Sequence, residues 1–251
     1  MTTSNEINAA SFIAAHRQKQ QFAATAEGAP ATAADAYAIQ DRVFAALNPG
    51  SRAGAWKVGA PRPGVEPTAA PIPPSRVFAS PANVKAADFH MIAVEIEVAF
   101  RLGKDLAGEV SADGAAAAVA EALVTIELCD TRLANWKEAT PLWKLADFQL
   151  NAALITGSGT GDWRAIDFSK QHAELWVDDK KVADVTGTHP LGDPLQLLPW
   201  LARHCAGRNG GLRAGDIITT GAWAGMFFAS PGTYLVAKFP GIGEAGVGLL
   251  N

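Results

Sequence analysis

The alternation of apolar and polar residues is clearest between Met91 and Leu102, where it repeats every second position. One set of alternate positions is apolar throughout, whereas the other includes Glu95 and Glu97. Successive side chains of a β-strand point to opposite faces, so the two glutamates must share one face, with Cα atoms about 6–7 Å apart. We therefore predict a strand that carries two neighbouring carboxylates.

Similar segments recur from Trp56 onward, separated by glycine and proline turns. Strands are predicted at Trp56–Gly59, Thr125–Cys129, Leu150–Thr156, Ile217–Thr220, Thr233–Phe239 and Ala245–Leu250, with a proline-rich loop at Pro61–Pro74 and a hairpin at Ala173–Val185. Helices are predicted at Ser11–Ala26, Asp35–Leu47, Asp113–Leu123 and Asp193–Gly207. Strands dominate without regular alternation with helices, which predicts an α+β fold. We expect a helical N-terminal part, residues 1–55, and a mixed-β domain, residues 56–251.

Composition narrows the class of protein. The chain has 251 residues, is 49% hydrophobic and 18% charged, and has a formal net charge of −4, which excludes extensive disorder. No basic stripe is present that would bind nucleic acid or an anionic membrane. Because neither a long apolar run nor a secretory leader occurs, we expect a cytoplasmic protein. The two cysteines, Cys129 and Cys205, are too few for a disulfide framework or a thiolate metal cage.

A third glutamate, Glu127, lies in an apolar segment that we predict to be another core strand. An ionised glutamate is seldom buried unless it is paired or bound to a metal. Glu95, Glu97 and Glu127 together supply oxygen donors that favour Mg²⁺ or Mn²⁺ over Zn²⁺. The alternative is that the neighbouring pair lies on a solvated strand face and binds nothing.

Three carboxylates bring a formal charge of −3, so a nearby basic group is expected. Lys57 is the candidate because bulky apolar residues flank it. The alternative is a strand-end lysine with its ammonium in water. His189 is either a loop histidine or a substrate contact, and Asp130 and Arg132 are predicted to pair with each other. The sequence has no phosphate-binding loop, dinucleotide glycine pattern, nucleophile elbow or H-E-x-x-H motif, which disfavours nucleotide and nucleophilic-serine chemistry.

Several short motifs, each weak alone, follow one another in a set order: Asp35–Gln40, Trp56–Gly59, Val94–Phe100, Glu127–Arg132, His189–Leu191, Trp200–Ala202, Leu212–Asp216, Thr220-Gly221 and Pro231–Thr233. Their order and spacing resemble the fumarylacetoacetate hydrolase superfamily over most of the chain. Within it, the similarity is to the branch of 2-keto-4-pentenoate hydratases and 4-oxalocrotonate decarboxylases. The resemblance implies a mixed β-roll or β-sandwich body behind a small helical N-terminal part.

The resemblance also implies an active site. The ligands of Mg²⁺ or Mn²⁺ would be Glu95, Glu97 and Glu127. The catalytic residue, which would move a proton or stabilise an enolate oxygen, would be Lys57. The residues predicted to bind the substrate are Thr220, Gly221 and His189.

The activity implied is that of a metal-dependent hydro-lyase, which adds water to a 2-hydroxydienoate or 2-keto-enoic acid during the degradation of aromatic compounds. The same intermediate would allow decarboxylation of an oxalocrotonate or hydrolysis of an acylpyruvate C–C bond. We expect a small 2-keto acid as substrate, a homo-oligomer, and association with a sister enzyme of the pathway. A non-catalytic subunit that binds an oxo acid, or a structural oligomer with hydrated glutamates, are the alternatives.

The chain departs from the family near the predicted site. Asp147-Phe148-Gln149-Leu150 stands where family members carry Asp-Asn-Ala-Ser, so Phe148 and Leu150 replace two polar residues. The loop after Lys57 lacks an expected acidic residue unless Glu66 takes its place. We therefore predict a retained metal site beneath a remodelled and more apolar pocket.

Overall fold

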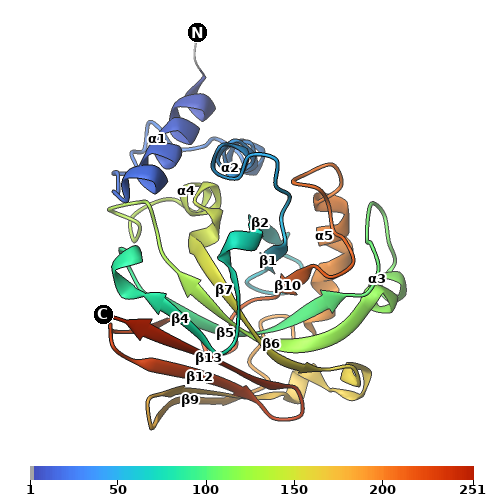
Figure 1. Ribbon diagram of the computed structural model, residues 1–251. Coiled ribbons are helices and arrows are strands. Elements are labelled where there is room, and N and C mark those ends of the chain that lie inside the picture. Colours follow the sequence, from blue (N-terminus) through green and yellow to red (C-terminus); the bar gives the residue numbers. More distant parts are fainter. Residues whose placement is uncertain (1–2) are drawn as a thin grey trace.

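Two β-sheets carry most of the fold, and the two N-terminal helices lie at one end of the molecule (Figure 1). The computed structural model describes residues 3–251. The first sheet contains β1 (Ala55–Gly59), β2 (Thr68–Ile72), β3 (Val77–Ala79), β5 (Ala93–Leu102), β6 (Val119–Cys129), β7 (Asn151–Thr160), β10 (Ile217–Thr219) and β11 (Phe227–Phe228). The second contains β4 (Ala82–Lys85), β8 (His172–Val177), β9 (Lys180–Thr186), β12 (Tyr234–Phe239) and β13 (Gly243–Leu250). Their spatial orders are β2-β1-β10-β5-β6-β7-β3, with β11 beside β5, and β4-β13-β12-β8-β9.

The helices are short, and the two longest precede β1. The α-helices are α1 (Ser4–Gln18), α2 (Ala33–Leu47), α3 (Ala112–Ala118), α4 (Pro141–Ala146) and α5 (Leu198–His204). Short 3-10 helices are η1 (Pro74–Arg76), η2 (Ala86–Asp88), η3 (Phe148–Leu150), η4 (Trp163–Ala165), η5 (Phe168–Lys170) and η6 (Pro194–Leu197). Capping boxes start α1 and α2, because the side chains of Thr3 and Thr32 accept hydrogen bonds from the backbone of Glu6 and Asp35. No helix within residues 3–251 is long and apolar enough to cross a bilayer.

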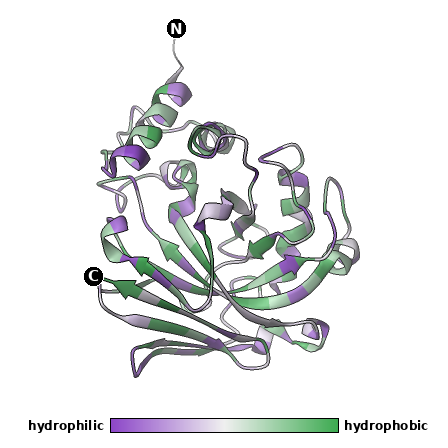
Figure 2. Ribbon diagram, in the orientation of Figure 1, coloured by the Kyte–Doolittle hydropathy of each residue, from purple (hydrophilic) through white to green (hydrophobic). Residues whose placement is uncertain are grey.

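The two faces of β5 have different surroundings. Val94, Ile96 and Val98 belong to the main core, which also contains Leu235 and Val247 of the second sheet. Figure 2 shows hydrophobic residues along the strands of both sheets, as this packing requires. The opposite face of β5, here called the inner face of the first sheet, carries the glutamates at one end and a small apolar cluster at the other. That cluster comprises Ala55, Ile72, Ala99, Leu123, Leu154 and Ile217.

The α+β prediction is confirmed, as is the hairpin, which is formed by β8 and β9. The predicted ends of two helices are wrong. α1 ends at Gln18 because Lys19 adopts a left-handed conformation, and Phe22 then bridges to Leu133 instead of continuing the helix. The helix predicted to reach Leu123 stops at Ala118, since pairing with β5 overrides the helix propensity of alanine. The division into parts 1–55 and 56–251 stays a prediction.

The proline-rich segment is also more ordered than predicted, because β2 forms inside it and pairs with β1 in antiparallel register. A proline is tolerated in β2 because this strand lies at the edge of the first sheet. The glycine run Gly157-Ser158-Gly159 has a packing role, since a Cβ at Gly157 would overlap the backbone of Glu244. The glycine therefore allows β7 and β13, from different sheets, to approach closely.

Candidate active site

Four neighbouring strands place charged side chains on the inner face of the first sheet. Antiparallel pairing of β5 with β6 sets Glu95 opposite Glu127, and Glu97 follows two residues later on β5. On the other side of β5 lies β10. β10 also pairs in parallel with β1, and this pairing sets Lys57 opposite Thr219. Segments far apart in sequence thus bring three carboxylates, here called the carboxylate cluster, next to one ammonium group.

The ammonium group of Lys57 lies inside this cluster. Its Nζ is 2.8 Å from Oε1 of Glu127 and 3.6 Å from Oε2 of Glu95. It also donates a hydrogen bond of 3.1 Å to the backbone carbonyl of Gln149. Only 12% of the side chain is exposed, which excludes a strand-end lysine with its charge in bulk water.

Glu97 and Glu127 are fully buried, and in each one carboxylate oxygen accepts hydrogen bonds whereas the other has no partner. Oε1 of Glu127 accepts hydrogen bonds from Lys57 and, at 2.9 Å, from Nδ2 of Asn151. Oε2 of Glu97 accepts from the backbone N–H of Gly221 at 2.7 Å and from the hydroxyl of Thr219. The other oxygens, Oε2 of Glu127 and Oε1 of Glu97, are buried without a partner. A solvated strand face is therefore excluded for these two glutamates.

Burial changes the protonation of the site. For Glu127, burial outweighs the attraction of Lys57 and raises the pKa to about 7. Burial is also the largest cause of the raised pKa of Glu95 and Glu97. Burial alone would lower the pKa of Lys57, but the neighbouring carboxylates, chiefly Glu127 and Glu95, raise it well above its usual value. The lysine is therefore held as a cation.

The donor set fits a hard divalent cation. Ligand atoms of Glu95, Glu127 and Cys129 lie within 4.8 Å of one another, and Glu97 adjoins them without belonging to that group. Buried carboxylate oxygens without partners are costly, and a cation can satisfy them. Carboxylate ligation is typical of Mg²⁺ and Mn²⁺ sites. Cys129 was missed as a neighbour of the site, although its two-residue spacing from Glu127 indicates a shared strand face.

His189 and Thr220 are brought beside the carboxylate cluster through Gly221. Nδ1 of His189 accepts a 3.3 Å hydrogen bond from the backbone N–H of Leu191, so Nε2 carries the proton and donates it to the carbonyl of Thr220 at 2.9 Å. The Thr220 hydroxyl donates a 2.6 Å hydrogen bond to the carbonyl of Val98. Both ring nitrogens of His189 are thus used inside the protein, and the ring holds the backbone that leads to Gly221.

The turn that ends in β7 forms one wall of the site. Phe148, Gln149 and Leu150 all have φ between 53° and 65°, a left-handed backbone conformation that residues other than glycine rarely adopt. This turn presents the carbonyl of Gln149 to Lys57 and the amide of Asn151 to Glu127. Neither contact was predicted from the sequence, because none of these three residue types favours the left-handed turn on which both contacts depend.

The predicted pairing of Asp130 with Arg132 is wrong. Arg132 is buried against Asp147, which receives both its side-chain and its backbone N–H groups. Asp130 accepts hydrogen bonds from the backbone N–H groups of His90 and Met91 instead. Both residues lie beyond the end of β6 at Cys129, so the alternation of a strand no longer places their side chains on one face. Glu66, the acidic residue considered for the loop after Lys57, accepts a hydrogen bond from the Trp200 indole. The carboxylates that pair with Lys57 are those of Glu95 and Glu127.

Comparison with known proteins agrees with this α+β fold. Residues 43–248 match the family model described as "Fumarylacetoacetate (FAA) hydrolase C-terminal". This match covers most of the chain, and the chain belongs to the fumarylacetoacetate hydrolase family. The resemblance found in the sequence is thereby confirmed.

Related proteins indicate which branch of the family the chain resembles. A 2-keto-4-pentenoate hydratase of Paraburkholderia phymatum is 35% identical over 154 residues, which are 60% of this chain and 58% of the relative. A second 2-keto-4-pentenoate hydratase, from Burkholderia vietnamiensis, is 33% identical with the same coverage. Each match spans less than two thirds of the relative. The fold of 4-oxalocrotonate decarboxylase from Pseudomonas putida G7, complexed with magnesium and adipate, is similar with a TM-score of 0.86, 21% identity, and coverage of 100% of this chain and 99% of that one.

Proposed function

We propose that this protein is a divalent-metal-dependent hydratase that adds water to 2-keto-4-pentenoate or a related 2-hydroxydienoate. The observation that carries the proposal is the buried ammonium of Lys57, 2.8 Å from Glu127 and 3.6 Å from Glu95 on the inner face of the first sheet. The two relatives that share about a third of their aligned residues with this chain are named for this hydration.

The residues proposed to hold the cation are Glu95, Glu97 and Glu127. Support comes from the two buried, unpartnered carboxylate oxygens and from the magnesium in the structurally similar decarboxylase. When bound, Mg²⁺ or Mn²⁺ would supply a Lewis acid that polarises the oxygens of an α-oxo acid. Removing the charge of any one carboxylate should therefore weaken cation binding.

Lys57 is the proposed catalytic residue. A charged ammonium in a nearly dry site stabilises negative charge on a substrate oxygen more strongly than water does, and it can pass a proton to and from a neighbouring atom. Hydrogen bonds to Glu127 and to the carbonyl of Gln149 hold it in one direction. A substrate oxygen or carbon in reach of Nζ would therefore meet a preoriented proton donor.

Gly221 is proposed to orient the substrate beside Glu97, with Thr220 and His189 fixing its backbone through their hydrogen bonds. The far side of the site is apolar, since Cys129 and Leu150 pack together with Met91, Trp136 and Met226. This surface supports a substrate whose tail, beyond the oxo-acid end, carries no charge. A homo-oligomer, a sister enzyme as partner and a cytoplasmic location stay predictions of the family resemblance.

The test is turnover of 2-hydroxypenta-2,4-dienoate with Mg²⁺. We expect the conjugated absorbance to fall and 4-hydroxy-2-oxopentanoate to appear by mass spectrometry. Glu97→Gln should abolish the reaction, whereas Glu121→Gln, at a partly exposed carboxylate paired with Arg101, should retain it. Release of CO₂ from 4-oxalocrotonate, or of pyruvate from an acylpyruvate, without hydration would assign one of the sister reactions instead. No turnover of any of these acids would refute an enzymatic role and favour a subunit that only binds them.

A further inference from the structure

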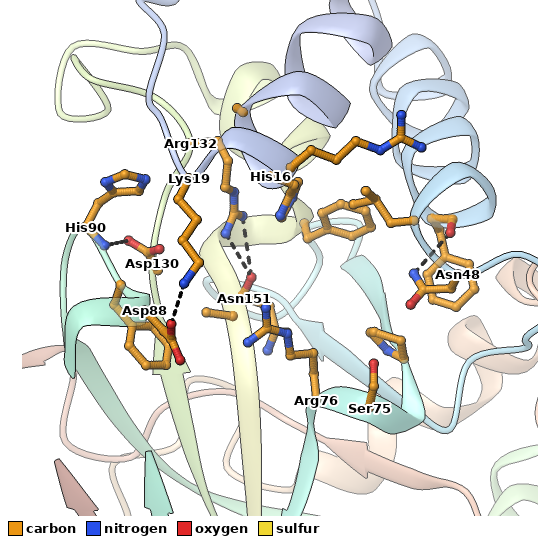
Figure 3. A pocket seen from close by; sticks show the side chains of 18 of the residues that line it. His16, Lys19, Asn48, Ser75, Arg76, Asp88, His90, Asp130, Arg132 and Asn151 are labelled. Carbon is orange, nitrogen blue, oxygen red and sulfur yellow. Dashed lines mark hydrogen bonds and ion pairs between the residues drawn. The ribbon is translucent and has the colours of Figure 1, made fainter. Parts of the chain in front are cut away.

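A cavity of about 470 Å³ lies outside the carboxylate cluster. It is bounded by the C-terminal ends of α1 and α2, by η1 and by the start of β7, and Figure 3 shows it from close by. Neither the glutamates of the cluster nor Lys57 line it. Its volume is in the range of sites that hold small organic molecules.

One side of this cavity is cationic. Figure 3 shows the side chains of His16, Arg76 and Arg132 pointing toward the same space from three different elements. Arg132 is already paired with Asp147. The guanidinium group of Arg76 forms no hydrogen bond or ion pair with any residue in 3–251, and Nε2 of His16 is buried without a partner. Two nitrogen groups at this wall are thus left without an acceptor.

The acidic residues at the cavity are satisfied by the protein itself. Asp88 pairs with Lys19 at 2.6 Å, and Asp130 accepts two backbone hydrogen bonds. Burial, followed by the charges of Arg132 and Arg76, lowers the pKa of His16 to about 3, so its ring is neutral. An anion that entered would meet uncompensated positive charge at Arg76 and a neutral imidazole.

The remaining wall is apolar and is formed largely by Phe44, Leu47, Phe89 and Phe148. An inorganic anion would leave this wall without contacts, whereas a carboxylate with a hydrocarbon body would fill both halves of the cavity. We propose that the cavity is a second ligand site, which binds a small organic acid with one carboxylate at Arg76 and His16 and an apolar chain against the phenylalanines. This site goes beyond the proposed hydratase function and does not depend on it.

Asn151 adjoins both the cavity and the carboxylate cluster. Asn151 lines the cavity, and its side-chain amide donates to Glu127 on the other side. A ligand in the cavity therefore lies outside the carboxylate cluster and needs no divalent cation. Binding in the presence of a chelator, and in a Glu97→Gln variant, separates this site from the proposed catalytic one.

The probe is hexanoate, titrated calorimetrically into the full-length protein with a chelator present. We expect a Kd near or below about 1 mM, and weakening by at least about tenfold in Arg76→Gln. His16→Ala should weaken binding in the same direction. The matched control is Arg203→Gln, at an exposed arginine of α5 that pairs with Glu109, and it should bind as the unaltered protein does. Arg76 is exposed, so its replacement should leave folding intact, which circular dichroism verifies.

Neutral hexanamide and inorganic phosphate test the two halves of the ligand, and each should bind at least about tenfold more weakly than hexanoate. Phosphate binding as tight as that of hexanoate would overturn the apolar part of the assignment. Absent binding, an Arg76→Gln variant with unchanged affinity, or displacement of hexanoate by Mg²⁺ with oxalate would overturn the site. Retained hexanoate binding in Glu97→Gln supports the second site, whatever becomes of the hydratase activity.

Discussion

Lys57 and Glu127 form an ion pair of 2.8 Å in which 12% of one side chain and none of the other is exposed. Breaking such a pair by removing one partner leaves an uncompensated buried charge, whereas removing both can be nearly neutral. The two residues come from β1 and β6, which are not adjacent in the sheet, so the pair also ties the inner face together.

The first prediction concerns this pair. With a chelator present and at alkaline pH, Lys57→Met should lower the free energy of unfolding by about 3 kcal/mol, because the buried Glu127 must then stay ionised without a counter-charge or take up a proton. Burial raises the pKa of Glu127 to about 7 although Lys57 lowers it, so in the variant this pKa rises further and the folded state binds the proton more tightly than the unfolded state. The loss should therefore be largest at alkaline pH and shrink as the pH falls through the raised pKa of Glu127. Urea unfolding at several pH values measures it.

The double variant Lys57→Met/Glu127→Gln should recover most of the stability lost by Lys57→Met alone. A positive coupling energy in this double-mutant cycle is the expected result. If the two substitutions add independently at high pH, the ion pair contributes nothing and this account of the site is wrong.

A second prediction concerns the cation. Ligands that bind only the folded state raise its stability, so Mg²⁺ or Mn²⁺ should raise the melting temperature of the unaltered protein. Glu97→Gln removes a donor charge and should weaken Mn²⁺ affinity by at least about tenfold, or 1.4 kcal/mol. Glu121→Gln should have no effect on it. Calorimetric titration of Mn²⁺ gives both affinities, and an equal response of the two variants would show that Glu97 is not a ligand.

The course of β5 and of the second half of β6 could be predicted because alternation fixes which side chains share a face, and two glutamates amid apolar residues indicate a buried site. The register between the strands could not, since nothing local to Glu95 specifies Glu127 as its partner. The bulky apolar residues that flank Lys57 likewise made it a candidate, but they did not predict its contact with the Gln149 carbonyl. That contact depends on a left-handed turn formed by residues with no intrinsic preference for it.

The errors have a common cause, which is tertiary contact that overrides local preference. The alanine-rich segment before Leu123 favours helix, yet its second half pairs with β5 along the core. Asp130 and Arg132 are close in sequence, but Asp147, fifteen or more residues away, is the acid buried beside the guanidinium. The cavity beneath α1 could not be predicted at all, because its walls come from segments that only the folded chain brings together.

His189 provides a third prediction, which separates positioning from substrate contact. Its ring holds the Thr220 carbonyl, and the next backbone N–H, that of Gly221, binds Glu97. His189→Phe should keep the ring volume but free this segment, and so weaken Mn²⁺ affinity by several-fold. A rise in KM with unchanged Mn²⁺ affinity would instead indicate direct contact with the substrate. Kinetics and calorimetry on the same variant distinguish these outcomes.

The last prediction concerns acid stability and rests on His204. Its ring stacks on Trp200 with centroids 4.5 Å apart, and burial together with the charge of Arg208 lowers its pKa from 6.5 to about 4. Between these values the unfolded chain binds more protons than the folded protein, so stability should fall as the pH falls from 6.5 toward 4. His204→Gln should remove about 1–2 kcal/mol of that loss, a range that allows for screening of a partly exposed ring. Urea unfolding at intervals between these pH values gives the slope. His16, whose pKa of about 3 acts in the same direction, should leave part of the slope in place. Identical slopes for the two proteins would mean that the stacked ring at His204 is protonated as readily as in the unfolded chain.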